Sequence, residues 1–359
     1  MAESFEIDFL GVETKKSGDA IALRYEQNAQ TFIHVIDGGY ASTGEALRDH
    51  IIEHYGDPKT LDHVVATHND GDHARGLVPI LEHFEVKALW MLRPWLYAQE
   101  LLPRFKNYSN VDNLRAALRT AYSNLADLED IAIKKRIPIY EPFQGQQIGA
   151  FVVMAPTRAR FLDLVVSSDK TPLAKVEAAI QGFKDFLVEA AKAAVAYVNG
   201  AWGDEYFPAS DTSDENEMSV VQYALIAGEK ILLTADTGRE GLAEVVAYAP
   251  SVGLNLPGVD RFQVPHHGGR RNLTTDLLDS ILGPRLESKP VSPLFKAYIS
   301  SAKADEDHPR KVVQRAMIHR GARLSQTEGS GIHAKSSNVS MREGWGPITP
   351  VAYPEEYEE

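Results

Sequence analysis

Cysteine is absent from this chain of 359 residues. Its absence excludes disulfide bonds, thiolate metal sites and a cysteine nucleophile, so a metal site has to use His, Asp or Glu. Residues 1–9 are acidic and lack the pattern of a signal peptide, and no apolar run is long enough to span a membrane. We therefore expect a cytoplasmic protein without membrane association.

An excess of positive charge is also missing. The formal net charge is −13 at pH 7, with 37 Lys and Arg residues against 50 Asp and Glu residues. A surface of this sign disfavours nonspecific binding along a long polyanion such as duplex DNA. It does not exclude phosphate chemistry inside a pocket, because a bound divalent metal dominates the charge there.

What the sequence does contain is a dense group of metal-capable side chains. His68, Asp70, Asp72 and His73 follow the apolar run Val64–Ala66. Imidazole is a ligand for zinc, manganese and iron, and carboxylate suits harder divalent ions. A polar turn that only caps a helix needs a single Asp, which makes this alternative the weaker one. The spacing therefore predicts a metal site at the end of a strand.

Apolar periodicity predicts strands that alternate with helices, which is typical of a layered α/β fold. The predicted strands are 5–10, 19–25, 31–36, 61–66, 87–91, 138–140, 151–154, 219–227, 231–234, 261–264 and 296–300, and the predicted helices are 44–55, 74–83, 111–131 and 312–320. Two of these strands also end in metal-capable residues, Asp236 and the pair His266–His267. Each alone is explained by a turn or a structured loop, but together they indicate strand ends that converge on one edge of a sheet.

The pattern of these residues resembles the metallo-β-lactamase superfamily. Its signature is His-x-His-x-Asp-His after a strand, then a later Asp and a late His, and the matching residues are His68, Asp70, Asp72, His73, Asp236 and His266. Asp70 stands where the signature has its second His. This variant resembles the branch found in the DNA-uptake protein ComEC and its soluble relatives. Further similar segments are Gly18–Ile21, Ile36–Gly39, Asn216–Val221, Leu232–Asp236, Val264–Gly268, His308–Pro309 and Thr327.

The resemblance implies an αββα sandwich, in which two face-to-face sheets carry outer helices and bind metals at one edge. Residues 1–350 would form one domain with helical insertions at about 94–135 and 158–210, followed by an acidic tail over 351–359 whose end, Pro354–Glu359, is expected to fray. Within the second insertion, Leu173–Val198 predicts an amphipathic helix that packs on the core. A lid, a dimer interface or a docking surface for a partner protein is the alternative.

The resemblance also implies two divalent metal ions. One would be bound by His68 and Asp70, the other by Asp72, His73 and His266, with Asp236 as the bridge. No His lies between His83 and Asp236, so the first site lacks its usual third nitrogen ligand. Oxygen-rich sites of this kind favour manganese, with zinc as the second choice.

The implied mechanism is hydrolysis by two metal ions. Asp72 would orient the attacking water as well as bind metal. His267 would contact the substrate or act as a general acid, although a hydrogen bond within its loop explains it equally well. The residues expected to contact the substrate are Arg270, Arg271, Asn216 and His308.

The function that this reasoning favours is a phosphodiesterase, most simply a nuclease, whose substrate is a nucleic acid or a nucleotide. The acidic surface argues for short substrates or for a partner protein that contributes the nucleic-acid contact. Hydrolysis of a lactone, thioester or amide is the alternative, because one fold hosts many chemistries. A catalytically weak accessory subunit of a multiprotein system is a third possibility, and the oligomeric state is not predicted.

Overall fold

The computed structural model describes residues 3–12, 14–171 and 197–358. The helix expected over Leu173–Val198 lies outside the described residues, apart from its last two positions. These two, Tyr197 and Val198, belong to a strand, β11 (Tyr197–Asn199). Within the described part of the chain, no helix is both long enough and apolar enough to cross a membrane.

The described residues form two seven-stranded sheets. The first has the order β17-β1-β2-β3-β5-β7-β8. Its strands are β1 (Ser4–Phe9), β2 (Ala20–Gln27), β3 (Gln30–Gly38), β5 (His63–Val65), β7 (Leu89–Trp90), β8 (Ile139–Tyr140) and β17 (Ile332–Lys335). The side chains of β1 alternate: Phe5, Ile7 and Phe9 join the hydrophobic core, whereas Glu6 and Asp8 bind polar partners on the other face.

The second sheet has the order β16-β15-β14-β13-β12-β10-β9. Its strands are β9 (Gln147–Ile148), β10 (Phe151–Ala155), β12 (Val221–Ile226), β13 (Glu229–Leu233), β14 (Arg261–Gln263), β15 (Phe295–Ile299) and β16 (Ala322–Gln326). The strands from β13 to β16 are parallel. The hairpin expected near 228 is present, and Ala227 and Gly228 turn it with positive φ angles of 53° and 77°.

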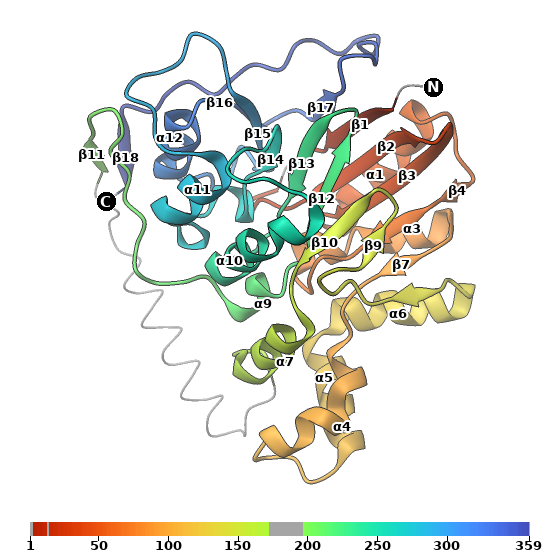
Figure 1. Cartoon of the computed structure of the whole chain (residues 1–359). Coiled ribbons are helices and arrows are strands. Elements are labelled where there is room, and N and C mark those ends of the chain that lie inside the picture. The colour runs from red at the N-terminus through yellow and green to blue at the C-terminus, as the bar shows by residue number, and fades with distance from the viewer. Residues whose placement is uncertain (1–2, 13, 172–196, 359) are drawn as a thin grey trace.

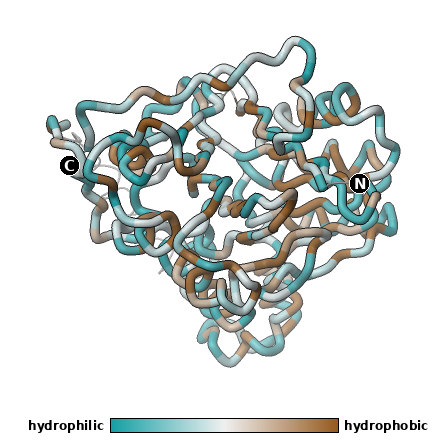
Figure 2. Tube along the Cα trace, turned by 45° about the horizontal axis from the view of Figure 1, so that its top comes forward, coloured by the Kyte–Doolittle hydropathy of each residue, from teal (hydrophilic) through white to brown (hydrophobic). Residues whose placement is uncertain are grey.

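The two sheets face each other and carry helices on their outer sides (Figure 1), which confirms the predicted αββα sandwich. Phe9 of the first sheet stacks on Tyr298 of the second, with ring centroids 5.0 Å apart. Hydrophobic residues follow the strands in the middle of the molecule, and hydrophilic ones follow the outer loops (Figure 2). The outer helices are α1 (Ala41–His54), α3 (Leu77–His83) and α6 (Ser123–Lys135) on the first sheet, and α10 (Arg239–Tyr248), α11 (Thr275–Leu282) and α12 (Lys311–His319) on the second.

The segment 94–135 is helical, as expected, but the single helix predicted over 111–131 is two helices. They are α5 (Val111–Ala121) and α6, separated at Tyr122. The same end of the molecule holds η1 (Pro94–Tyr97), α4 (Ala98–Leu101), η2 (Leu102–Arg104) and α7 (Arg158–Ser167) (Figure 1). The smaller elements are α9 (Asp214–Glu217), η3 (Ala249–Val252) and the paired strands β4 (Thr60–Leu61) and β6 (Glu85–Val86).

The acidic C-terminus is not frayed through residue 358, contrary to the prediction. Its strand β18 (Glu356–Glu358) pairs with β11. The buried Glu358 carboxylate accepts hydrogen bonds of 3.0 Å from the backbone N–H groups of Lys311 and Val312. A negative charge at the N-terminus of α12 is favourable, because the first N–H groups of a helix lack partners within it.

An ionic network holds the segment after β17 against the outer face of β1. Glu6 accepts hydrogen bonds from Arg24 (2.8 Å), from His333 (3.0 Å) and from Arg342 (3.2 Å). Burial raises the pKa of the Glu6 carboxyl. The hydrogen bonds from His333 and Arg24 lower it by a larger amount, so the pKa is about 2. The ionised form of Glu6 is therefore the form that stabilises the fold.

We predict that Glu6→Gln destabilises the protein at pH 7 by about 1–3 kcal/mol, because it leaves Arg24 without its anion and Arg342 with Asp8 alone. The folded pKa lies below the ordinary one, so the contribution of Glu6 is complete above about pH 4.5 and is lost as the pH falls towards 2. Urea unfolding of both proteins across this range checks the effect, with the exposed Glu45→Gln as control. A difference that stays constant with pH contradicts it.

Candidate metal centre

The metal-capable side chains come together because several strands end at the same edge. In the second sheet, Leu232 of β13 pairs with Phe262 of β14, so the loops that follow these parallel strands leave the sheet side by side. In the first sheet, Ile36 of β3 pairs with Val65 of β5. The loop after β5 leads into α2 (Gly71–Ala74), which carries the last part of the predicted motif.

Close backbone packing fixes this loop. A Cβ atom at Gly76 would lie 1.8 Å from the carbonyl oxygen of Gly38, and one at Gly44 would lie 2.0 Å from the carbonyl oxygen of Gly76. These contacts allow no side chain, so glycine is required at both positions. They hold the residues just after α2 against the end of β3 and the start of α1.

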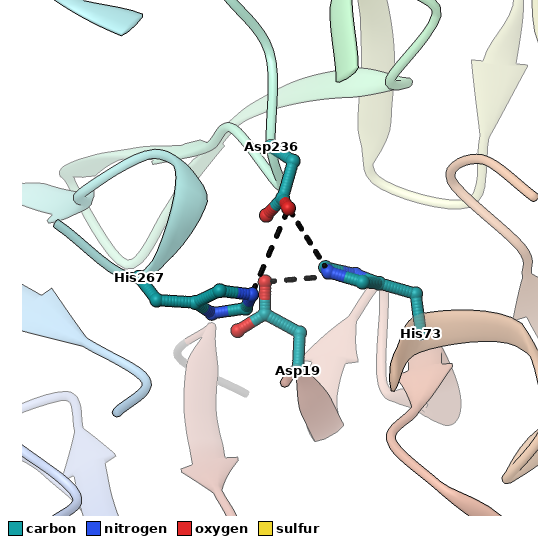
Figure 3. Close-up of side chains that lie close together, drawn as sticks. All are labelled: Asp19, His73, Asp236 and His267. Atoms are coloured by element: carbon teal, nitrogen blue, oxygen red, sulfur yellow. Dashed lines mark ion pairs between the residues drawn. The ribbon is translucent and has the colours of Figure 1, made fainter. Parts of the chain in front are cut away.

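The carboxylate of Asp236 is the centre of the cluster (Figure 3). Its Oδ2 atom lies 3.3 Å from Nε2 of His73 and 3.6 Å from Nε2 of His267. Nε2 of His266 lies 3.7 Å away, and Nε2 of His68 lies 4.0 Å away. Four imidazole rings from two sheets thus direct the same nitrogen towards one buried oxygen.

Each ring is oriented by a hydrogen bond from its other nitrogen. Nδ1 of His73 donates to Asp37 (2.8 Å), and Nδ1 of His267 donates to the carbonyl oxygen of Ser300 (3.0 Å). Nδ1 of His266 pairs with Asn272 Oδ1, and Nδ1 of His68 pairs with Thr67 Oγ1, both at 3.0 Å. These bonds leave the Nε2 lone pairs facing inward, which is the arrangement of metal-binding histidines.

The backbone around the cluster is held in an uncommon conformation. Asp37, Ala235, His266 and His267 all have positive φ angles, of 53°, 46°, 49° and 53°. Each such residue costs on the order of 1–3 kcal/mol and persists where the surroundings determine it. Residues of this kind gather at functional sites, and here all four lie at or next to the converging side chains.

Several buried polar atoms of the cluster have no hydrogen-bond partner among the described residues. They are Nε2 of His68, His73 and His267, Oδ1 of Asp236 and Oδ1 of Asp19. Buried polar groups are rarely left unpaired, because each unpaired group costs about 1–3 kcal/mol. A divalent cation bound by nitrogen and carboxylate ligands can satisfy the atoms of Asp19, His73, Asp236 and His267, whose ligand atoms lie within 4.8 Å of one another. The donor set present therefore fits a metal ion.

The charges of the cluster show the same preference for a cation. Burial lowers the pKa of His267. Asp236 and Asp72 raise it by a larger amount, so the pKa is about 9. Burial also lowers the pKa of His73, whereas Asp236 and Asp37 raise it to well above its ordinary value. Without a metal, protons on these imidazoles balance the buried carboxylates. A metal ion takes over this role and releases the protons.

The predicted ligands do not all lie in the inner cluster. Asp72 lies near it, with Oδ2 at 3.7 Å from Nε2 of His267. Asp70 points elsewhere and forms an ion pair of 2.6 Å with Lys170. His266 lies nearer the surface than His267, and Asn216 Nδ2 approaches its Nε2 at 3.4 Å. His267 thus lies beside Asp236 as closely as the predicted ligand His266 does, at 3.6 and 3.7 Å.

The predicted substrate contacts surround this centre unevenly. Asn216 approaches His266 directly, and the ring of His308 lies 4.9 Å from the ring of His266. Arg270 has a buried Nη1 atom without a partner among the described residues, and burial together with Arg310 lowers its pKa. Arg271 is exposed. No contact among the described residues joins either arginine to Asp236.

Sequence reasoning did not select two of the residues that complete the centre. Asp37, at the end of β3, accepts hydrogen bonds from His73 and from the backbone and hydroxyl of Thr67. Asp19, just before β2, lies within a compact group with His73, Asp236 and His267. Both occur at strand ends beside glycine, which is the signal that would have identified them.

Comparison with known proteins finds one family model that is similar to part of the chain. Residues 27–116 match the model of the metallo-beta-lactamase superfamily. The match contains the whole segment from His68 to His73, whereas Asp236 and His267 lie beyond it. No curated protein matches the chain. The finer resemblance to the ComEC branch stays a prediction.

Solved structures with a similar fold share little sequence with the chain. The hydrolase AbOPH of the beta lactamase superfamily is 13% identical over 61% of this chain, with a TM-score of 0.31. The match covers 56% of AbOPH, little more than half of its length. A Thermotoga maritima protein described as a metallo-beta-lactamase is 10% identical, with 70% of this chain and 86% of its own chain covered and a TM-score of 0.30.

We predict that Asp236→Asn abolishes divalent metal binding, because it removes the carboxylate on which the imidazoles converge. Asp37→Asn leaves the ligands in place but loosens His73, so metal affinity falls about 10–100-fold. Competition with a chromogenic chelator measures both effects, with the exposed Asp211→Asn as the matched control. Equal metal affinity in all four proteins contradicts the assignment.

Proposed function

We propose that this protein is a metal-dependent hydrolase that cleaves phosphodiester bonds, most simply as a nuclease. One observation carries the proposal: imidazole nitrogens without partners meet a buried carboxylate at the shared edge of two sheets. The match of residues 27–116 to the metallo-beta-lactamase superfamily supports a hydrolase. The choice of phosphodiesters rests on the carboxylates that surround the centre and on its resemblance to the ComEC branch.

We assign one metal ion to His73, His267, Asp236 and Asp72. The first three belong to the compact group around Asp236, and Asp72 approaches His267 from the rim. Two carboxylates and two imidazoles form a ligand set that manganese and zinc both accept, and we favour manganese. A bound divalent ion supplies an activated water and stabilises negative charge on a phosphoryl oxygen.

The side chains around the ligands have separate tasks in this proposal. Asp72 is the more exposed of the two carboxylates, with 26% of its side chain accessible against 3% for Asp236, so it is the one that can orient a water molecule. Asn216 and His308, beside His266, are placed to contact the substrate. The ring of His308 also lies near Asp305, with Nδ1 at 3.6 Å from Oδ2.

Binding of the predicted second metal ion is opposed by the ammonium group of Lys170. His68 has a free Nε2 atom near Asp236, but the other expected ligand, Asp70, pairs with the Lys170 ammonium group. A cation is thus already present at the position that a second metal would use. We propose that the centre binds one metal ion tightly and that Lys170 competes for the other position.

We predict manganese-dependent cleavage of bis-nitrophenyl phosphate and of short single-stranded DNA. Asp72→Asn and His267→Gln should each lower kcat by at least about 100-fold, because they disturb the ligands that activate the water. The control is His83→Gln, an exposed histidine on α3. Addition of zinc or magnesium to metal-free protein ranks the metals.

The same assays separate the alternatives. Cleavage of a lactone, thioester or amide without cleavage of any phosphodiester, under every metal tested, overturns the proposed substrate class but not the hydrolase. A protein that binds metal and cleaves none of these substrates is the accessory subunit. RNA and duplex DNA are also tested as substrates. The acidic surface disfavours long duplexes, so duplex DNA should be cleaved more slowly than short single strands.

We predict that Lys170→Met raises the number of manganese ions bound per chain from about one to about two, because it frees Asp70. Metal analysis after equilibrium dialysis measures this number without reference to activity. Lys134→Met, at an exposed position of α6, is the control. Two ions in the unaltered protein, or one in both proteins, shows that Lys170 does not compete.

A further inference from the structure

A polar cavity of about 270 Å³ lies at the end of the second sheet that is opposite to the metal centre. The metal centre follows the carboxyl ends of β13 and β14. The cavity is instead lined by residues at the beginnings of β14, β15 and β16, together with residues of β17. Its basic lining residues are Arg261, Lys296, Arg323 and Lys335.

Strand register aligns three of these cations. Arg261 is opposite Lys296 in one parallel pair, and Lys296 is opposite Arg323 in the next. Residues that are opposite in register point to the same face of a sheet. Like charges placed opposite each other on neighbouring strands destabilise the sheet, so a row of three needs compensation.

Among the described residues, a carboxylate balances the positive charge at only one end of this row. Arg261 pairs with the carboxylate of Glu229 and donates to the hydroxyl of Tyr298 (2.7 Å). Among the described residues, no carboxylate lies within ion-pair distance of Lys296 or Arg323. Arg323 donates only to the carbonyl oxygen of Ile348 (2.9 Å), which leaves its charge unbalanced.

Partial burial increases the cost of this arrangement. Lys296 and Arg323 are both half-buried, so water screens their repulsion less than it does at the surface. Burial lowers the pKa of Lys296, and Arg261 lowers it further. The local excess of cations is also opposite to the net charge of the chain, which is −13.

We propose that this cavity binds a small phosphorylated anion between Lys296 and Arg323. A guanidinium group binds phosphate oxygens in pairs, and an ammonium group adds a point charge, so together they match a phosphate better than a single carboxylate. The volume lies below the ~300–1,000 Å³ of typical small-molecule pockets, which restricts the ligand to a small one. The site is separate from the metal centre, and the proposal does not depend on the proposed reaction.

The test is isothermal titration of the full-length protein with inorganic phosphate at constant ionic strength. We expect saturable binding that Lys296→Met and Arg323→Met each weaken by at least about tenfold, because each removes a charged hydrogen-bond donor. The matched control is Lys106→Met, an exposed lysine between η2 and α5 at the other end of the molecule.

A second control excludes binding at the metal centre. Asp236→Asn should bind phosphate as the unaltered protein does, because its change lies at the other edge of the sheet. Binding that is lost in Asp236→Asn but kept in Lys296→Met overturns the proposal. So does the absence of saturable binding, or equal weakening in Lys106→Met.

Discussion

The hydrogen bonds of Asp37 are the interaction on which the centre depends. This buried carboxylate accepts from the backbone and hydroxyl of Thr67, at 2.9 and 2.6 Å, and from Nδ1 of His73 at 2.8 Å. It thereby connects the end of β3 to the loop after β5 and to α2. The Thr67 hydroxyl in turn pairs with His68. One carboxylate thus sets the orientation of two imidazoles.

This preorganisation has an energetic cost that the sandwich offsets. Unpaired buried nitrogens and four residues with positive φ destabilise the edge of the sheets. The large core between and outside the sheets supplies the opposing burial, and the contacts among Gly38, Gly44 and Gly76 leave the loop no space to relax. A bound ion recovers part of the cost. The centre therefore has the features of a site that a bound ligand stabilises.

Local periodicity predicted a layered α/β fold and the strand ends that bear Asp72, His73 and Asp236, and the resemblance to the metallo-β-lactamase superfamily implied the sandwich. They did not select Asp37 and Asp19, whose importance comes from contacts with residues far along the chain. The deeper burial of His267 than of His266 was also beyond a pattern, because both have left-handed backbones and the resulting turn decides how deep each ring lies. The partner of Asp70 is Lys170, one hundred positions away, and no spacing rule connects such residues.

The distribution of charge limits what this chain can bind. Its net charge of −13 repels long polyanions at a distance, so electrostatic steering does not favour duplex DNA. At short range, two places reverse this sign: the metal centre, once a cation occupies it, and the row from Arg261 to Arg323. Both lie at sheet edges, where strand register brings charged side chains together. The two proposals together therefore favour small or single-stranded anions as ligands, because these reach sites of limited size without covering the acidic surface around them.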